Sequence, residues 1–189
     1  EGTEASTLEA KNVIIASGSI SALPNFIPKH DRIVDSRSFL ERTKLPVSMI
    51  VLGGGVIGCE LACMAAQLGV KVTIIEMLED ILFMLDADVR RELHRSMEVS
   101  LGITILIGKS LNKIQAEAAG VTGEVNGQKI MAELMLVSVG RKPVTACLSL
   151  EKAGLDITET GHIEIDSFCA TRVEGIYAIG DVTAGSTQL

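Results

Sequence analysis

The residues with the clearest chemical meaning are the glycines between positions 53 and 58, in the run Gly53-Gly54-Gly55-Val56-Ile57-Gly58. Their spacing fits G-x-G-x-x-G, a pattern that binds a dinucleotide pyrophosphate when a strand precedes it and a helix follows. Gly53 would permit a tight turn, Gly55 would let phosphates approach the backbone, and Gly58 would let helix and strand pack closely. The N–H groups that begin the helix would attract the phosphates. We therefore predict a pyrophosphate site here, and the alternative is a tight turn without a ligand.

An acidic residue occupies the position at which such a site needs one. Glu76 follows Gly58 by 18 residues and ends the next apolar segment. An acid at this position accepts hydrogen bonds from the hydroxyls of the adenine ribose. The same carboxylate would repel the additional phosphate of NADP, and Met77 and Leu78 offer no cation to bind that phosphate. We therefore predict NAD as the cofactor, and the alternative is an exposed carboxylate at a strand end.

Other residue types in this region carry weaker signals. Glu60 lies just past Gly58, where the spacing alone favours an acid that interacts with the helix dipole. Cys59 and Cys63 lie four residues apart on the predicted helix, without a histidine or further cysteine nearby to complete a metal site. Helix geometry also does not suit a disulfide between them, so we interpret them as packing residues and predict no metal. We assign no role to the three histidines, which are His30, His94 and His162.

A defined set of elements must position the glycine run and Glu76. Residues 48–52 form a continuous apolar run that predicts a buried strand, residues 57–68 predict a helix rich in small side chains, and residues 71–76 predict the next strand. A strand, helix and strand in fewer than 30 residues form a βαβ unit. Its two strands should be parallel neighbours with a right-handed crossover.

The rest of the chain adds a further helix, several strands and a hairpin. Residues 86–100 predict an amphipathic helix with Val89, Leu93 and Met97 facing inward and the arginines, Arg90 among them, facing outward. Asn126-Gly127, between two apolar segments, predicts a type I′ hairpin. Further strands are predicted at 11–16, 103–107, 133–139, 162–165 and 175–179, and a short helix at 35–41. The sequence therefore predicts an α/β fold with a Rossmann-like parallel sheet and an antiparallel three-stranded excursion.

Composition excludes several functional classes. The 189 residues are 47% hydrophobic, which excludes a disordered chain. The net charge of −7 argues against a nucleic-acid or anionic-membrane surface, because both need a concentrated positive field. No apolar run approaches the roughly 20 residues that span a bilayer. Four cysteines without a secretory signal indicate reduced thiols in a cytoplasmic compartment.

Nearly the whole chain resembles the FAD-dependent pyridine nucleotide–disulfide oxidoreductases, and most of all the dihydrolipoamide dehydrogenases among them. Four segments carry the resemblance: the strand and turn at 11–19, the NAD fingerprint at 53–60, the Gly-Arg-x-Pro-like segment at 138–143 and the second FAD fingerprint at 175–181. The resemblance implies that Glu60 and Gly140 lie at the nicotinamide end of the site. It also implies that Ser17, Gly18, Ser19 and Asp181 contact FAD and that Ser110 touches the adenosine.

The resemblance also shows which parts of that family are missing here. The family's C-x4-C redox pair is absent, since Cys59 and Cys63 are spaced C-x3-C, so we predict no catalytic residue in this chain. The first FAD fingerprint and the dimerisation domain with its acid–base histidine are absent too, and we expect a fragment of a longer protein. The expected domains are an FAD strip (1–20), a connector (21–45), the NAD-binding domain (46–144) and a truncated return to the FAD domain (145–189).

The implied chemistry of the parent is electron transfer from dihydrolipoamide, through an enzyme disulfide and FAD, to NAD. The parent would be a homodimer in a 2-oxoacid dehydrogenase complex, and the fragment would bind NAD or NADH without turning over a dithiol. Two alternatives stay open. One is a fragment of an FAD-dependent NADH oxidase or ferredoxin reductase, and the other is an NAD-binding module without catalytic activity.

Overall fold

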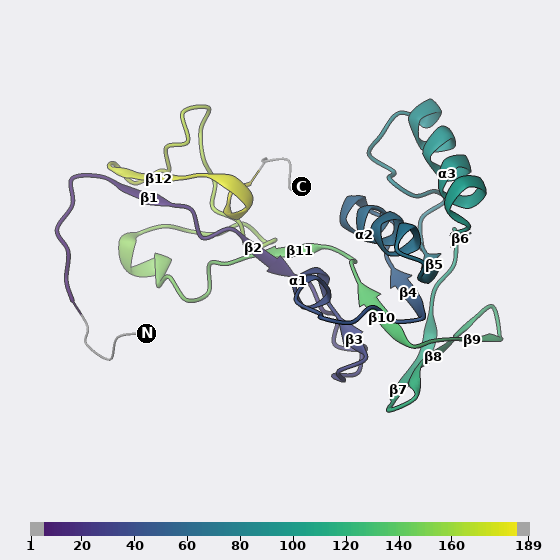
Figure 1. Ribbon diagram of the computed structural model, residues 1–189. Coiled ribbons are helices and arrows are strands. Elements are labelled where there is room, and N and C mark those ends of the chain that lie inside the picture. The colour runs from purple at the N-terminus through teal and green to yellow at the C-terminus, as the bar shows by residue number, and fades with distance from the viewer. Residues whose placement is uncertain (1–5, 185–189) are drawn as a thin grey trace. The chain divides into compact units, whose positions relative to one another are not determined.

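The computed structural model describes residues 6–184, and the chain forms two compact units (Figure 1). Unit 1 combines the described parts of Glu1–Ile20 and Arg141–Leu189, and unit 2 is the continuous stretch Ser21–Gly140. The outer ends of the two expected FAD strips, residues 1–5 and 185–189, lie outside the described residues. Within residues 6–184, no helix combines the length and apolar character that crossing a bilayer requires.

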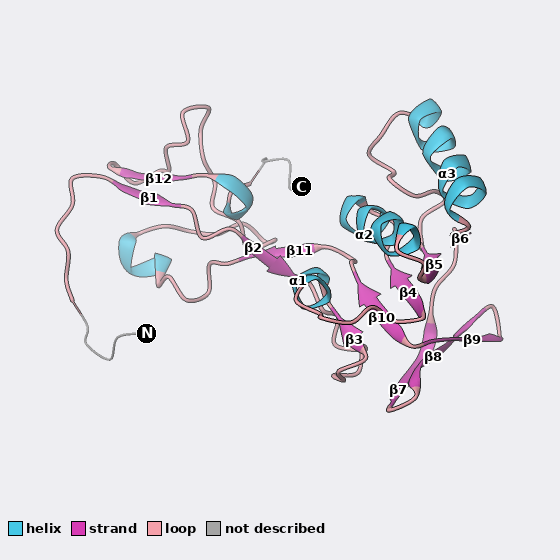
Figure 2. Ribbon diagram, viewed as in Figure 1, coloured by secondary structure: helices cyan, strands magenta, loops and turns pink. Residues whose placement is uncertain are grey.

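Unit 2 is built on a five-stranded parallel sheet with the strand order β3-β10-β4-β5-β6 (Figure 2). Its strands are β3 (Ile33–Val34), β10 (Leu134–Val137), β4 (Ser48–Leu52), β5 (Lys71–Ile75) and β6 (Thr104–Leu106). Leu52 pairs with Val137 on one side and with Ile75 on the other. The carboxyl ends of β10, β4 and β5 are therefore level, and the residues that follow them meet at one edge.

The two faces of this sheet are covered differently. Helices α1 (Ser36–Leu40), α2 (Val56–Gln67) and α3 (Ala87–Leu101) contribute to the core on one face, with Met49 and Val51 of β4. The other face, with Ile50 and Leu52, is covered by the antiparallel strands β7 (Asn112–Glu117), β8 (Gly120–Val125) and β9 (Gln128–Ala132). This arrangement confirms the predicted α/β fold with its antiparallel three-stranded excursion.

The hairpin between β8 and β9 forms at the predicted dipeptide. Asn126 and Gly127 have φ angles of 51° and 79°, so both lie in the left-handed region that a type I′ turn requires. Val125 pairs with Gln128 across the turn. The tight turn thereby fixes the register of the two strands.

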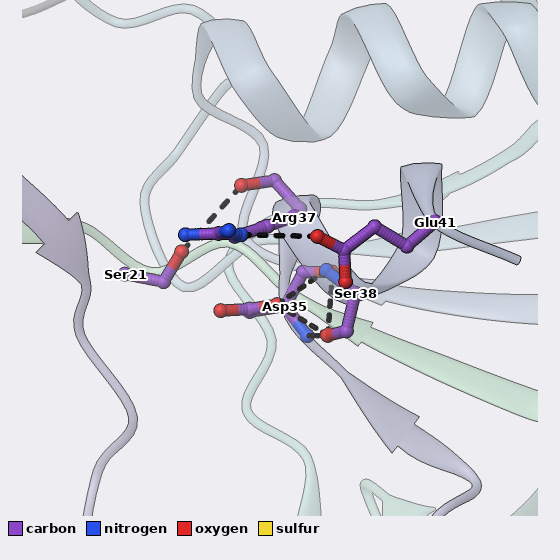
Figure 3. Close-up of polar contacts among 6 residues, drawn as sticks. Ser21, Asp35, Arg37, Ser38 and Glu41 are labelled. Carbon is purple, nitrogen blue, oxygen red and sulfur yellow. Dashed lines mark hydrogen bonds and ion pairs between the residues drawn. The ribbon is translucent and has the colours of Figure 1, made fainter. Parts of the chain in front are cut away.

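The short helix α1 follows the N-cap residue Asp35, which forms a capping box with Ser38 (Figure 3). The Ser38 N–H donates to Asp35 Oδ1 at 2.8 Å, and the Asp35 N–H donates to Ser38 Oγ at 3.1 Å. This capping box satisfies donors that the first helical turn leaves without partners. The helix lies within the stretch 35–41 that was predicted to be helical, and it buries Phe39 in the core.

Unit 1 contains two small two-stranded sheets, except that Ser21, the last residue of β2, belongs to unit 2. Strand β1 (Val13–Ile15) runs parallel to β12 (Ile176–Ala178), and β2 (Ser19–Ser21) pairs with β11 (Arg141–Pro143). The predicted strand at 162–165 is wrong: Ile163 makes only isolated bridges, although its side chain is fully buried. The apolar alternation there reflects burial of one side chain in the core of unit 1 and not a continuous ladder.

Helix α3 differs from its predicted orientation. Met97 is buried as expected, but Val89 and Leu93 are 47% and 39% exposed. The Arg90 side chain, expected to face outward, is only 18% exposed, and His94 is 22% exposed. The first half of the helix therefore packs a polar face against the chain, which the hydrophobic pattern alone could not indicate.

Candidate functional site

Three chain segments meet at the carboxyl edge of the parallel sheet in unit 2. The glycine run follows β4, Glu76 follows β5 and Ser138 follows β10. Backbone hydrogen bonds tie the segments together: the Gly53 N–H donates to Ile75 O at 2.9 Å and the Ser138 N–H donates to Leu52 O at 2.8 Å. In open α/β sheets this edge is where ligands bind.

Gly53, Gly54 and Gly58 are required by close packing. Gly53 has φ +107°, and a Cβ there would lie 2.5 Å from Ser138 O. A Cβ on Gly58 would lie 2.1 Å from Gly53 O, and a Cβ on Gly54 would lie 2.8 Å from Ile81 Cγ2. These distances are shorter than van der Waals contact, so any side chain at the three positions would displace the backbone or its neighbours.

Gly55 is different because the space around it is open. A Cβ on Gly55 would meet no atom within 4 Å, and its φ of −75° is available to any residue. Gly55 is the N-cap of α2, and no side chain caps this end of the helix. The first N–H groups of α2 and its positive dipole end are therefore available to an anion. Packing does not explain a glycine here, whereas the predicted approach of a phosphate would.

Glu76 is held beside the glycine turn by two backbone donors. Its Oε2 accepts from the Gly54 N–H at 2.5 Å and its Oε1 accepts from the Leu78 N–H at 2.7 Å. A carboxylate offers about four acceptor positions, so each oxygen retains capacity for a further donor. The side chain is half-buried, and Met77 beside it is 72% exposed. The arrangement holds the two oxygens of the Glu76 carboxylate in fixed positions at the edge of the sheet.

Ser138 is also part of this edge, although the sequence analysis assigned it no role of its own. Its Oγ lies 3.1 Å from both Leu52 O and Gly53 O, so its hydroxyl proton can bridge to either carbonyl and brace the turn. The available signal was a polar residue directly after a buried strand. Using it required knowing that β10 lies next to β4.

The other residues predicted to contact NAD are Glu60, Ser110 and Gly140, which also lie in unit 2. Glu60 is exposed on α2, just beyond the first turn. Ser110 is exposed after β6, and the neighbouring Lys109 N–H donates to Glu76 O at 3.0 Å. Gly140 is exposed with φ +132°, and a Cβ there would meet nothing within 4 Å. Their roles toward a nucleotide stay predictions.

Ser19 and Asp181, two of the predicted FAD residues, form a hydrogen-bonded cluster with Arg141 in unit 1. Ser19 Oγ donates to Asp181 Oδ2 at 2.6 Å. Arg141 donates from Nε to Ser19 Oγ at 2.6 Å and from Nη2 to Ser19 O at 2.7 Å, and its Nε lies 3.5 Å from Asp181 Oδ2. Arg141 thus fixes both residues, a role that its position in the Gly-Arg-x-Pro-like segment did not suggest.

The remaining two FAD candidates belong to the same turn after β1. Ser17 Oγ donates to Val144 O at 2.7 Å, and Gly18 has φ +69° with no atom within 4 Å of a Cβ placed on it. The turn is therefore anchored by Ser17 and open at Gly18. An open glycine beside a fixed serine and carboxylate is compatible with the close approach of a polar cofactor chain.

The cysteines on α2 are packing residues in unit 2. Cys59 is buried, its Sγ donates to Gly54 O at 3.4 Å, and burial raises the pKa of its thiol to about 12. Burial and the nearby Glu60 also raise the pKa of Cys63. All four cysteines are free thiols. A nucleophilic cysteine needs a thiolate, so this environment does not suit redox chemistry by Cys59 or Cys63.

Comparison with known proteins gives a consistent result. The family model of the pyridine nucleotide-disulphide oxidoreductases matches residues 1–189. The chain is 41% identical over 191 residues to a dihydrolipoyl dehydrogenase of Chlorobaculum parvum, covering 98% of this chain and 40% of the relative. It is 37% identical over 181 residues to a soluble pyridine nucleotide transhydrogenase of Mycobacterium bovis, covering 95% of this chain and 38% of the relative.

Solved structures agree with these relatives. The HOCl-induced flavoprotein disulfide reductase RclA from Escherichia coli superposes with a TM-score of 0.87 at 29% identity, over 94% of this chain and 41% of that one. The chain therefore spans about 40% of the length of the curated relatives it matches. The family match over residues 1–189, together with the glycine turn and its acid, shows that the chain belongs to the pyridine nucleotide–disulphide oxidoreductase family.

Proposed function

We propose that unit 2 binds NAD or NADH at the carboxyl edge of its parallel sheet. Enzymes of this family use FAD and NAD(P). The observation that carries the proposal is the open backbone at Gly55, directly beside the Glu76 carboxylate that Gly54 holds. The pyrophosphate would lie over the first N–H groups of α2, and the ribose hydroxyls would donate to Glu76.

We further propose that the site prefers NAD over NADP. The additional phosphate of NADP would be attached to the ribose next to the Glu76 carboxylate, where two negative charges would repel each other. Met77 and Leu78, which follow directly, are 72% and 47% exposed and carry no charge that could offset this repulsion. Exposed apolar side chains there suit the face of an adenine ring.

For the whole protein, we propose the activity of a dihydrolipoyl dehydrogenase: oxidation of dihydrolipoamide with reduction of NAD through FAD. The named relatives support this activity at 36–41% identity. The bound cofactors would supply hydride transfer between flavin and nicotinamide. The share of this chain is to hold the nucleotide through 53–58 and Glu76, and to contribute Ser19 and Asp181 toward FAD. A homodimer within a 2-oxoacid dehydrogenase complex is the corresponding assembly proposal.

A transhydrogenase is the second candidate, because relatives of that name match 95% of the chain at 37% identity. It would have to bind both NAD and NADP. The Glu76 carboxylate would disfavour NADP, because it would repel the additional phosphate. The binding experiment below therefore also separates the two candidate activities.

The test is a calorimetric titration of the 189-residue chain with NADH and with NADPH. We expect NADH to bind at least about tenfold more tightly, equivalent to about 1.4 kcal/mol. Glu76→Gln should weaken NADH binding, and Glu76→Arg should shift the preference toward NADPH. The matched control is Glu92→Gln, an exposed acid on α3. Equal affinity for the two nucleotides would refute the NAD preference, and no binding of either would refute the site.

A further inference from the structure

A loop joins β5 to α3 (Figure 1). Arg90, on α3, anchors this loop through Asp80. Its Nη1 lies 3.1 Å from Asp80 Oδ2, and its guanidinium carbon lies 5.3 Å from the centre of the Phe83 ring. The other Asp80 oxygen lies 3.3 Å from His94 Nδ1. We call the ion pair of Asp80 and Arg90, with Phe83, the clasp. Its charged side chains are 26% and 18% exposed, so the clasp is more sheltered than the other ion pairs along α3.

The loop that the clasp holds touches the nucleotide site at three points. The Leu78 N–H donates to Glu76 Oε1 at 2.7 Å, and the Leu82 N–H donates to Gly54 O at 2.8 Å. Ile81 is fully buried and packs so closely on Gly54 that a Cβ there would lie 2.8 Å from its Cγ2. The loop therefore orients both the glycine turn and the carboxylate beside it.

Leu82, within this loop, has an unusual backbone conformation that its surroundings must stabilise. It is a non-glycine residue with φ +51°, in the left-handed region that residues with a side chain rarely adopt. Such conformations persist only where the surroundings over-determine them, and they concentrate at ligand-binding sites. The strained residue is the one whose N–H donates to Gly54 O, and the two clasp residues of the loop flank it in sequence, Asp80 two residues before it and Phe83 directly after it.

We propose that Asp80 and Arg90 are positioning residues for the pyridine nucleotide, and that they act through Leu78, Ile81 and Leu82 without touching the ligand. This inference rests on the proposed binding of NADH at residues 53–58. Releasing the clasp lets Leu82 relax from its left-handed conformation and withdraw from Gly54. The glycine turn and Glu76 then lose their fixed orientation, although every group that contacts the nucleotide is still present.

The test compares four variants of the 189-residue chain at a temperature well below unfolding. Arg90→Met removes the charge at similar length, Asp80→Asn removes the other partner, and Arg90→Lys keeps a cation. The matched control is Arg91→Met, which removes an exposed arginine paired with Asp88 on the same helix. NADH affinity is measured by calorimetry, and amide hydrogen exchange is measured over residues 78–86.

We expect Arg90→Met and Asp80→Asn to weaken NADH binding about tenfold and to speed exchange at the Leu82 amide. Arg90→Lys should restore most of the affinity, and Arg91→Met should match the unmodified chain. Unchanged affinity in folded Arg90→Met overturns the proposal, whether or not exchange increases. If Arg90→Met does not fold, the same comparison is decided by Asp80→Asn. Failure of the unmodified chain to bind NADH overturns the proposed function instead, and is recognised before any variant is compared.

Discussion

Two alanine substitutions distinguish a glycine kept for a ligand from a glycine kept for packing. At Gly55 the backbone suits alanine and a Cβ meets no atom within 4 Å, so only the N-cap preference is lost, at about 0.5–1 kcal/mol. At Gly58 a Cβ would lie 2.1 Å from Gly53 O. Ordinary carbon–oxygen contacts are about 3.3 Å or longer, so α2 must shift by roughly 1 Å, and such overpacking costs about 1–3 kcal/mol.

The two variants should therefore fail in different assays. Thermal unfolding should place Gly55→Ala within about 4 °C of the unmodified chain and Gly58→Ala several degrees lower, since 1 kcal/mol corresponds to about 2–4 °C at this size. NADH calorimetry should show at least about a tenfold loss of affinity for Gly55→Ala, because its methyl group would occupy the proposed position of the pyrophosphate.

The contrast between the variants is the decisive result. If Gly55→Ala binds NADH as tightly as the unmodified chain, the pyrophosphate does not lie over this residue and the site is misplaced. If Gly58→Ala is as stable as Gly55→Ala, the close approach to Gly53 O does not constrain the helix. Either result would refute the reasoning from the glycine geometry.

Three further predictions concern stability and reactivity. Burial alone would raise the pKa of Asp35, but hydrogen bonds from Ser38 outweigh it and lower that pKa, so Asp35→Ala should cost about 1 kcal/mol in chemical denaturation, whereas the exposed control Asp31→Ala should cost almost nothing. The Val47 N–H and then Arg32 hold the pKa of Glu133 below its ordinary value of 4.5; the stability it contributes is present above that value and is lost as the pH falls through the lower, folded-state pKa. Chemical denaturation should therefore show that the free energy of unfolding falls less between about pH 6 and pH 3 for Glu133→Gln than for the unmodified chain. An equal fall in the two proteins would contradict this assignment. Because burial raises the pKa of Cys59 to about 12, iodoacetamide should label the exposed Cys147 and spare Cys59 until the chain unfolds, as mass spectrometry of the peptides would show.

The elements that the sequence predicted well are those encoded locally. The strand, glycine turn, helix and strand of residues 48–76 follow from adjacent residues, and the hairpin follows from Asn126-Gly127 alone. The candidate site was predictable to the same extent, because Glu76 lies at a fixed spacing from Gly58 within one βαβ unit. A single continuous segment supplies both the pattern and the geometry.

The parts that escaped prediction depend on contacts between distant segments. Ser138 braces the turn only because β10 lies beside β4, and Arg141 meets Asp181 only after unit 1 has folded. Arg90 carries a charge, and hydrophobic periodicity placed it outward. Its burial depends on the ion pair with Asp80 and the contact with the Phe83 ring, which hydrophobic periodicity does not detect.

The composition of unit 1 from both flanks of the sequence has a consequence for biogenesis. Val13 in β1 pairs with Ile176 in β12, so this pairing cannot form until almost all of the described chain has been synthesised. Unit 2 is contiguous and can complete its folding earlier, during translation. Because contacts between distant residues carry a larger loop-closure entropy, the β1–β12 ladder should form late. Nascent β1, whose Ile14 is 64% exposed in this structure, is therefore available to chaperones while unit 2 is synthesised.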